Sequence, residues 1–285
     1  MNLRTYTSLA ALALAGIAAP AFADENPGDY NGPYIAVSGG LATHDNHGGN
    51  RDTVVFDTDR DGKFGNPVVT STGGDAFANG FCNGAATAAT NPSFGTPCTP
   101  DHDAADYAVR LGYDARYGNV VMGVLVEGSK NDATDSVTAF STTPASYTFT
   151  RGIDYAVSAR ARLGFAPGHR GLMYVTGGPS YAKLNHSFTT TNTVNSFTQV
   201  NPDKMAWGWQ AGAGAEVVLG GGLTLGMEYL YNRYRDNKYY VQVGQGTAGA
   251  TNPFVLSGGT GGVYAAQQDP NYDFHSFRAV LGFRF

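Results

Sequence analysis

The last fourteen residues, Tyr272–Phe285, read YDFHSFRAVLGFRF and alternate between two kinds of side chain. Counting back in twos from the end gives only apolar residues, namely Phe285, Phe283, Leu281, Ala279 and Phe277. The positions between them include Arg284 and Arg278. A period of two is typical of a β-strand, because successive side chains of a strand point to opposite faces. The segment therefore predicts a strand with one apolar face and one arginine-bearing face, which ends on an aromatic residue.

The other end of the chain has the pattern of an export signal. It carries Arg4, then an apolar run over Leu9–Ala19, and then the small-x-small site Ala21-Phe22-Ala23. Such a segment is typical of a cleaved secretory signal peptide. We therefore expect a signal peptide over residues 1–23, cut after Ala23, and a single exported domain over residues 24–285.

The composition excludes a helical membrane protein and favours short strands. No later stretch holds the roughly 20 consecutive apolar residues of a membrane-spanning helix, and the mean hydropathy is −0.22. The chain has 39 Gly, 17 Tyr and 16 Phe, and only 14% of its residues are charged, which suits strands, turns and aromatic belts. The net charge of −5 comes with no basic cluster, so nucleic acid is not expected as a partner.

Several other segments repeat the alternation of the terminal one. The segment Ala206–Leu219 and the segment Leu223–Tyr234 both alternate, and only a GGG turn lies between them, which predicts a hairpin. In total the sequence predicts eight strands, near Pro33–Thr43, Ala104–Tyr117, Asn119–Lys130, Arg151–Phe165, Gly171–Leu184, Lys204–Leu219, Gly222–Arg235 and Tyr272–Phe285.

The connections between these strands alternate in length. Three are short turns, near Tyr117–Asn119, Ala166–Arg170 and Gly220–Gly222. Four are long and polar, near His44–Asp103, Asn131–Thr150, Asn185–Asp203 and Asp236–Asn271. Short turns at one end and long loops at the other are typical of bacterial outer-membrane barrels. The predicted fold is therefore all-β: an eight-stranded antiparallel up-and-down transmembrane β-barrel with four long external loops.

Charged side chains on the strands fall on the face opposite the large apolar residues, among small Gly, Ala and Ser. An eight-stranded barrel is just wide enough for side chains to fill its interior. We therefore expect a lumen in which nearly balanced charges pair. The residues predicted for this lumen charge network are Arg110, Arg116, Glu127, Asp154, Arg160, Arg162, Glu216, Glu228 and Arg278, with Asp114 and Arg284 on the same face.

The stretches WGWQAGAGAEVVLGGGLTLGMEYLY, YVTGGPSYAKL and DFHSFRAVLGFRF resemble strands of the small opacity-like outer-membrane β-barrel family, including the Omp25/Omp31-type porins of alphaproteobacteria. The resemblance covers the eight strands in outline and is absent from the loops. It implies an outer-membrane location in a Gram-negative bacterium and recognition of the last strand by the barrel-insertion machinery. On this basis Phe277, Leu281, Phe283 and Phe285 are the predicted assembly signal.

Two loop features suggest further sites. Cys82 and Cys98 are the only cysteines, and export into an oxidising compartment predicts a disulfide between them. The stretch Asp57–Gly62, DTDRDG, copies the first half of a calcium-binding loop, so Asp57, Asp59 and Asp61 are candidate metal ligands. Val68, however, stands where the bidentate Glu of such a loop would be.

The expected function is structural and surface-directed. We expect an integral barrel that contributes to the cell envelope and displays loops, with outer-membrane lipid as a partner and surface or host contact through the loops. One alternative is a small porin or channel for ions or solutes. The other is an adhesin or ligand-capturing protein that acts through its loops. No enzymatic activity and no cofactor are expected.

Overall fold

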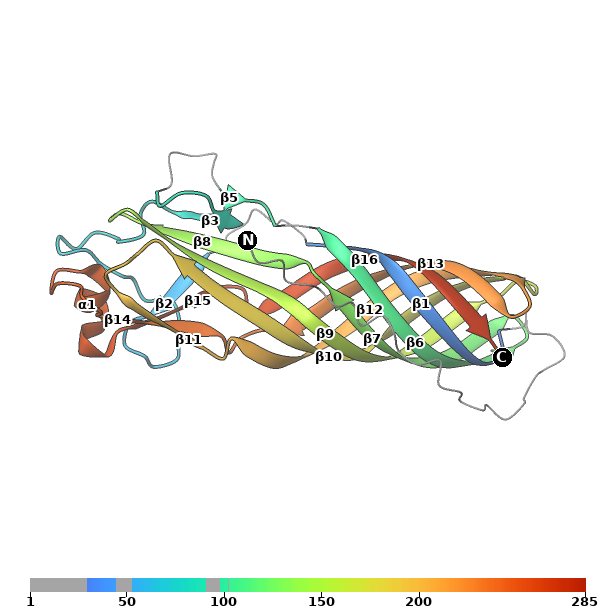
Figure 1. Ribbon diagram of the computed structural model, residues 1–285. Coiled ribbons are helices and arrows are strands. Elements are labelled where there is room, and N and C mark those ends of the chain that lie inside the picture. The colour runs from blue at the N-terminus through green and yellow to red at the C-terminus, as the bar shows by residue number, and fades with distance from the viewer. Residues whose placement is uncertain (1–29, 45–52, 91–97, 102) are drawn as a thin grey trace, which may run out of the picture.

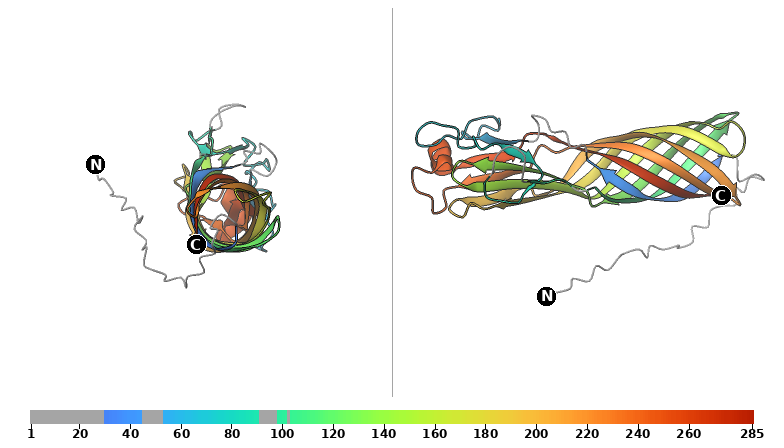
Figure 2. Two further views of the ribbon diagram at one scale, coloured as in Figure 1. Left: turned by 90° about the vertical axis from the view of Figure 1, so that its right-hand side faces the viewer. Right: turned by 90° about the horizontal axis from the view of Figure 1, so that it is seen from above.

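The computed structural model describes residues 30–44, 53–90, 98–101 and 103–285, and the predicted signal peptide lies outside these residues. The molecule is elongated, with a β-barrel at one end and a second body of β-structure, here called the external domain, at the other (Figure 1). The chain ends at the barrel end, far from the external domain (Figures 1 and 2). In the described part of the chain, no helix is long and apolar enough to cross a membrane.

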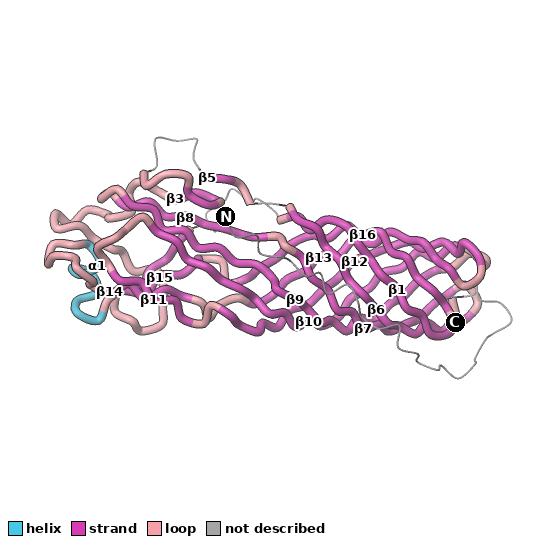
Figure 3. Tube along the Cα trace, in the orientation of Figure 1, coloured by secondary structure: helices cyan, strands magenta, loops and turns pink. Residues whose placement is uncertain are grey.

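Eight long strands close into a ring of antiparallel pairs. The ring runs β1–β6–β7–β9–β10–β12–β13–β16 and returns to β1. The predicted eight-stranded barrel is therefore confirmed, and the tube view shows the tilt of its strands (Figure 3). The strands span Gly32–Thr43 (β1), Ala104–Tyr117 (β6), Val120–Asn131 (β7), Ala145–Phe165 (β9), Gly171–Thr190 (β10), Asp203–Gly220 (β12), Leu223–Arg235 (β13) and Asn271–Arg284 (β16).

The outer face of the barrel is a continuous apolar band. Met227 on β13 is 75% exposed and Trp207 on β12 is 68% exposed. Exposure of such apolar side chains to water is unfavourable, whereas their contact with lipid is favourable. Every strand of the ring contributes to the band, through residues such as Val37, Val109, Val124, Val157, Val175, Val217, Leu225 and Leu281. The alternation in the sequence thus separates a lipid face from a lumen face.

Tight turns join the strands at the end where the chain terminates. Gly118 has φ 63° and Gly221 has φ 58°, a left-handed conformation that glycine adopts without strain. Because the connections here are short and those at the opposite end are long, this end is the periplasmic side. The external domain therefore lies outside the cell.

The four long connections are not irregular loops, because they contain most of the external domain. A four-stranded sheet has the order β11–β14–β15–β2, and β8 and β3 extend the barrel sheet beyond β9. The additional elements span Val54–Asp57 (β2), Phe81–Asn83 (β3), Ala85–Ala86 (β4), Cys98–Thr99 (β5), Thr134–Ser141 (β8), Ser196–Val200 (β11), Tyr240–Gly244 (β14), Pro253–Gly258 (α1), Gly259–Gly261 (η1) and Val263–Gln267 (β15).

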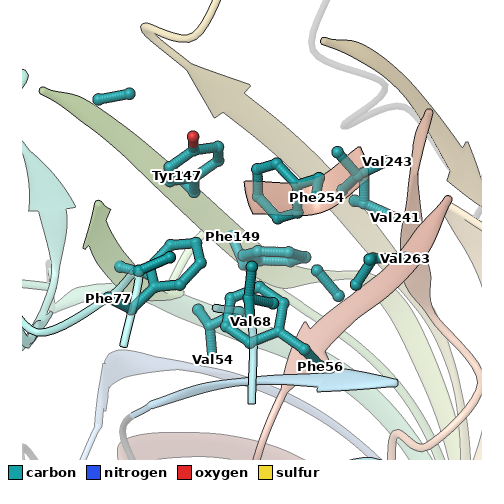
Figure 4. Packing of buried hydrophobic residues seen from close by; sticks show 14 of the residues in the cluster. Val54, Phe56, Val68, Phe77, Tyr147, Phe149, Val241, Val243, Phe254 and Val263 are labelled. Carbon is teal, nitrogen blue, oxygen red and sulfur yellow. The ribbon is translucent and has the colours of Figure 1, made fainter. Parts of the chain in front are cut away.

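An apolar core holds the external domain together (Figure 4). Phe77 stacks on Phe56, with ring centroids 4.4 Å apart, and both rings lie near Phe254 of α1. Side chains from all four long connections meet in this core, which also includes Val54, Val68, Tyr147, Phe149, Val241, Val243 and Val263. The four long external connections are present as predicted, and in addition they fold against one another around buried hydrophobic residues.

Candidate functional site

Six ionised side chains form an upper lumen cluster in the middle of the barrel. They are Asp106, Arg110, Glu127, Arg160, Glu228 and Arg278, and each is buried to at least 97%. Three guanidinium groups face three carboxylates, so the cluster is neutral. Burying isolated charges is very costly, and this pairing is what makes their burial tolerable.

Short ion pairs connect the whole upper lumen cluster. Arg110 binds Glu228 through two bonds, with Nη2–Oε1 at 2.6 Å and Nη1–Oε2 at 3.0 Å. Glu127 accepts hydrogen bonds from Arg160 Nη2 at 2.6 Å and from Arg278 Nη1 at 2.6 Å. Its Oε2 also lies 2.9 Å from Arg110 Nε, within ion-pair distance. These bonds join β6, β7, β9, β13 and β16 across the lumen.

A lower lumen cluster of two arginines and two acids lies towards the periplasm. Arg162 binds Glu216 through Nη1–Oε1 at 2.8 Å and Nη2–Oε2 at 3.1 Å. Arg284 binds Asp114 at 2.6 Å. The Arg162 guanidinium carbon also lies 4.1 Å from the centre of the Tyr174 ring, a favourable cation–π geometry.

Glycines on the lumen face make room for the larger side chains. A Cβ on Gly112 would lie 2.4 Å from the Tyr34 ring, and one on Gly214 would lie 2.5 Å from the Tyr174 ring. These positions accept no side chain without moving a ring. The interleaving of glycine and large residues in the sequence is thus the packing pattern of a filled lumen.

Apolar and polar layers close the lumen above and below the two charged clusters. Towards the periplasm, Tyr30, Val121, Ala166, Leu172 and Tyr174 form a buried cluster. Towards the external domain, a polar layer includes the bond from Asn232 Nδ2 to Ser276 Oγ at 3.2 Å. Above it lies a buried cap formed by Ala42, Ala133, Ile153, Ala156, Ala182, Leu184, Ala206, Tyr234, Tyr272 and Phe274. The barrel interior is therefore filled in successive layers.

Two residues predicted for the lumen charge network lie elsewhere. Asp154 pairs with Lys183 at 3.1 Å, and both side chains are about one-third exposed. The pairing of β9 with β10 shifts at Lys183/Leu184, so Asp154 is an extra residue in β9 and loses its inward direction. Arg116 is half-buried and donates to the carbonyls of Gly118 and Gly168, at the periplasmic turns.

One member of the upper lumen cluster, Asp106, is not among the residues predicted from the sequence. Asp106 accepts two bonds from Arg278, from Nε at 2.7 Å and from Nη2 at 3.0 Å. The signal was present, because Asp106 is an even number of positions before Arg110 on β6 and so shares its face.

A third buried polar cluster, here called the collar, lies between the barrel and the external domain. Arg151 binds Asp135 at 2.6 Å and Asp236 at 3.3 Å, and His186 Nε2 lies 2.9 Å from Asp236. The Tyr239 ring stacks on His186 with centroids 4.3 Å apart. Burial alone would raise the pKa of the Asp236 carboxyl, but the hydrogen bond from His186 and the charge of Arg151 outweigh it and lower that pKa.

The acid-rich turn after β2 brings its three carboxylates close together. One oxygen from each of Asp57, Asp59 and Asp61 lies within 4.8 Å of the others. The buried Asp57 already accepts from the backbone N–H of Arg60 at 2.6 Å and of Gly62 at 2.9 Å, which stabilises the turn itself. Val68 is buried in the external core and supplies no side-chain oxygen. Metal binding at these residues stays a prediction.

A disulfide joins Cys82 on β3 to Cys98 on β5. β3 pairs with β8, and β5 pairs with β4, so the bond fastens two short ladders of the first connection to each other. The disulfide therefore lies in the external domain.

A closed antiparallel ring with a lipid-facing band, a filled lumen and short turns on one side defines an integral outer-membrane β-barrel protein. The chain belongs to the outer membrane protein beta-barrel domain family, whose model matches residues 9–285. It is therefore a protein of the outer membrane of a Gram-negative bacterium, and the family resemblance of its strands is confirmed.

The chain is similar to several known proteins. It is 32% identical over 124 residues to the 31 kDa outer-membrane immunogenic protein of Brucella melitensis, a match covering 43% of the chain and 51% of that relative. The chain thus spans about half the length of the curated relative it matches. A likeness also exists to outer membrane protein OprG from Pseudomonas aeruginosa, with TM-score 0.44, 10% identity and coverage of 91% of this chain and 100% of that one. For Ail, the attachment invasion locus protein of Yersinia pestis, the TM-score is 0.31 at 10% identity, covering 89% of this chain and 99% of that one.

Proposed function

We propose that the protein is a closed outer-membrane barrel that displays a folded domain at the cell surface. Through this external domain it contacts host cells or extracellular matrix. The observation that carries this proposal is the combination of a lumen filled by neutral ion-pair clusters with an external domain that has its own apolar core. The proposal includes the absence of enzymatic activity, since the buried charged groups are engaged with one another.

The channel alternative makes a distinct prediction. Ions that crossed the barrel would have to pass the cap containing Tyr234, Tyr272 and Phe274, both charged clusters, and the periplasmic layer containing Tyr30 and Leu172. We expect planar lipid bilayers containing the full chain to show no steady single-channel conductance. Steady, large conductance steps would favour the channel and contradict the proposal.

Surface contact can be tested by unfolding the external domain alone. Phe254 is 4% exposed in the external core, so Phe254→Asp places an unpaired charge among aromatic rings. The barrel does not contain this core, and a heat-modifiability gel should still report a closed barrel. We expect binding of the bacteria to host cells or extracellular matrix to be lost in this variant.

A matched control is Leu256→Ser on the same helix, because Leu256 is 44% exposed and outside the core. This variant should fold and bind as the wild type does. If Phe254→Asp unfolded the external domain while the bacteria bound as before, contact through this domain would be excluded, and only the envelope role would remain.

A further inference from the structure

The sheet β11–β14–β15–β2 has an outward face that differs from ordinary exposed surface. Tyr239, Val241 and Val243 point into the external core. Since strand residues alternate, Tyr240 and Gln242 of the same strand point outward, and both are only half-buried. Thr198 on β11 and Tyr264 on β15 are each in register with Gln242. These four residues, Thr198, Tyr240, Gln242 and Tyr264, are here called the tyrosine platform.

Two aromatic rings contact each other on the platform. The ring centroids of Tyr240 and Tyr264 are 4.6 Å apart and the rings are tilted by 45°, so they pack against each other at an angle and form a small, partly exposed aromatic surface. The Gln242 amide and the Thr198 hydroxyl lie in the adjacent row and can each donate and accept hydrogen bonds. A saccharide packs its C–H groups against aromatic faces, and its hydroxyl groups form hydrogen bonds with uncharged polar side chains.

The surroundings of the platform are almost free of charge. No Asp, Glu, Lys or Arg occurs in residues 137–150, 187–200 or 239–268, which supply β14, β15, β11 and much of the rest of the external domain. A typical protein surface is roughly one-quarter to one-third charged. The last residue of β2, Asp57, is in register with Tyr264, but its carboxylate binds backbone N–H groups of the following turn. Arg60 of that turn donates to the Gly261 carbonyl at 3.2 Å, and the exposed Lys238 lies two residues before Tyr240.

We propose that the tyrosine platform binds uncharged oligosaccharides. A sulfated or otherwise anionic glycan would need cationic side chains, and the platform offers none. A protein partner would need about 800 Å² on each side, far more than a pair of half-buried rings provides. This inference rests on the proposed function, because it names the class of partner that the external domain contacts.

The test measures glycan binding by the full chain refolded in detergent micelles. The probes are uncharged oligomers of glucose and of N-acetylglucosamine, with heparin as the sulfated comparison. The variants are Tyr240→Ser and Tyr264→Ser, and Leu256→Ser is the control elsewhere on the external domain. We expect the wild type to bind at least one uncharged oligomer, and each tyrosine variant to bind it about tenfold more weakly. The affinity should not change between about 0.05 and about 0.5 M salt.

Three results would overturn the inference: no binding of uncharged oligomers by the wild type, unchanged affinity in both tyrosine variants, or tighter, salt-sensitive binding of heparin. Heat-modifiability and circular dichroism verify that each variant is folded. If Phe254→Asp abolishes cell contact while the tyrosine variants retain it, the proposed function stands and the glycan inference fails. If Phe254→Asp unfolds the external domain and leaves cell contact intact, the proposed contact through this domain fails, and the glycan inference loses its basis with it.

Discussion

Arg278 and Asp106 bind each other across a glycine. Arg278 lies on β16 and Asp106 on β6, and the strand between them, β1, places Gly40 in register with both. The arginine reaches over this position to make two bonds, at 2.7 and 3.0 Å. A Cβ on Gly40 would lie 1.8 Å from the Phe277 carbonyl oxygen, so the absence of a side chain there lets the ion pair span three strands.

Breaking this pair should destabilise the barrel much more than removing it. Arg278→Leu leaves the Asp106 carboxylate buried without its partner, and we expect a loss of about 3–5 kcal/mol in the free energy of unfolding. The double variant Arg278→Leu/Asp106→Leu should recover most of that loss, because neither charge remains. Urea unfolding in lipid vesicles, followed by tryptophan fluorescence, measures both. If the double variant were as unstable as Arg278→Leu, the loss would come from removing the ion pair and not from leaving the Asp106 carboxylate buried without a partner.

The collar makes the external domain sensitive to acid. The folded-state pKa of Asp236 lies below its ordinary value, so the unfolded chain binds more protons between the two pKa values. The contribution of Asp236 to stability is therefore complete above the unfolded pKa of about 3.9 and is lost as pH falls through the folded pKa. We expect the external domain to become protease-sensitive in that acid range, while at neutral pH it resists.

The variant Asp236→Asn should be less stable at neutral pH and should show a weaker dependence on acid. Asp132→Asn is the matched control, because Asp132 is an exposed acid on the neighbouring β7–β8 connection. Equal acid sensitivity in the wild type and in Asp236→Asn would assign the effect to other carboxyls.

The disulfide should stabilise the external domain and leave the barrel unaffected. Cys82 and Cys98 are 16 residues apart, and closing a loop of this length is worth about 3 kcal/mol in chain entropy. The variant Cys82→Ser/Cys98→Ser should therefore be cut faster by protease in the external domain. A heat-modifiability gel with and without reductant should show the same folded-barrel band, and a loss of that band would mean that the barrel depends on the bond.

The terminal Phe285 should matter more for assembly than for stability. Its side chain is 48% exposed on the lipid side and contacts Phe283, with ring centroids 5.3 Å apart. Burial of one such side chain contributes about 1.5–3 kcal/mol, a small part of a closed ring of hydrogen bonds. We expect Phe285→Ser to accumulate unfolded in the periplasm, because recognition of the last strand precedes closure, and yet to refold into lipid in vitro.

Leu223→Ser is the control for this prediction, since Leu223 is a lipid-facing residue in register with Phe283 at the same end of the barrel. It should reach the outer membrane at a normal level. Normal membrane levels of Phe285→Ser would refute the assembly signal and leave Phe277, Leu281, Phe283 and Phe285 only a lipid-facing role.

The barrel could be predicted from sequence because lipid and lumen impose a period of two on every strand. The same rule failed at Asp154, where one extra residue in β9 reverses the direction of the side chain without any mark in the sequence. The external core was not predictable in this way. Phe77, Phe254 and Phe197 come from three different long connections, and their contacts depend on how the barrel places the strand ends.

The strands β9 and β10 run without interruption from the periplasmic turn into the external domain (Figure 1). Beyond the shifted pairing at Lys183, β9 continues through Ala145–Ile153, and at about 3.3 Å per residue this stretch reaches on the order of 30 Å. The two paired strands form a continuous connection between the barrel and the external domain. The external domain is thereby held at a fixed distance from the barrel, and a pulling force on it would be transmitted along these strands to the barrel wall.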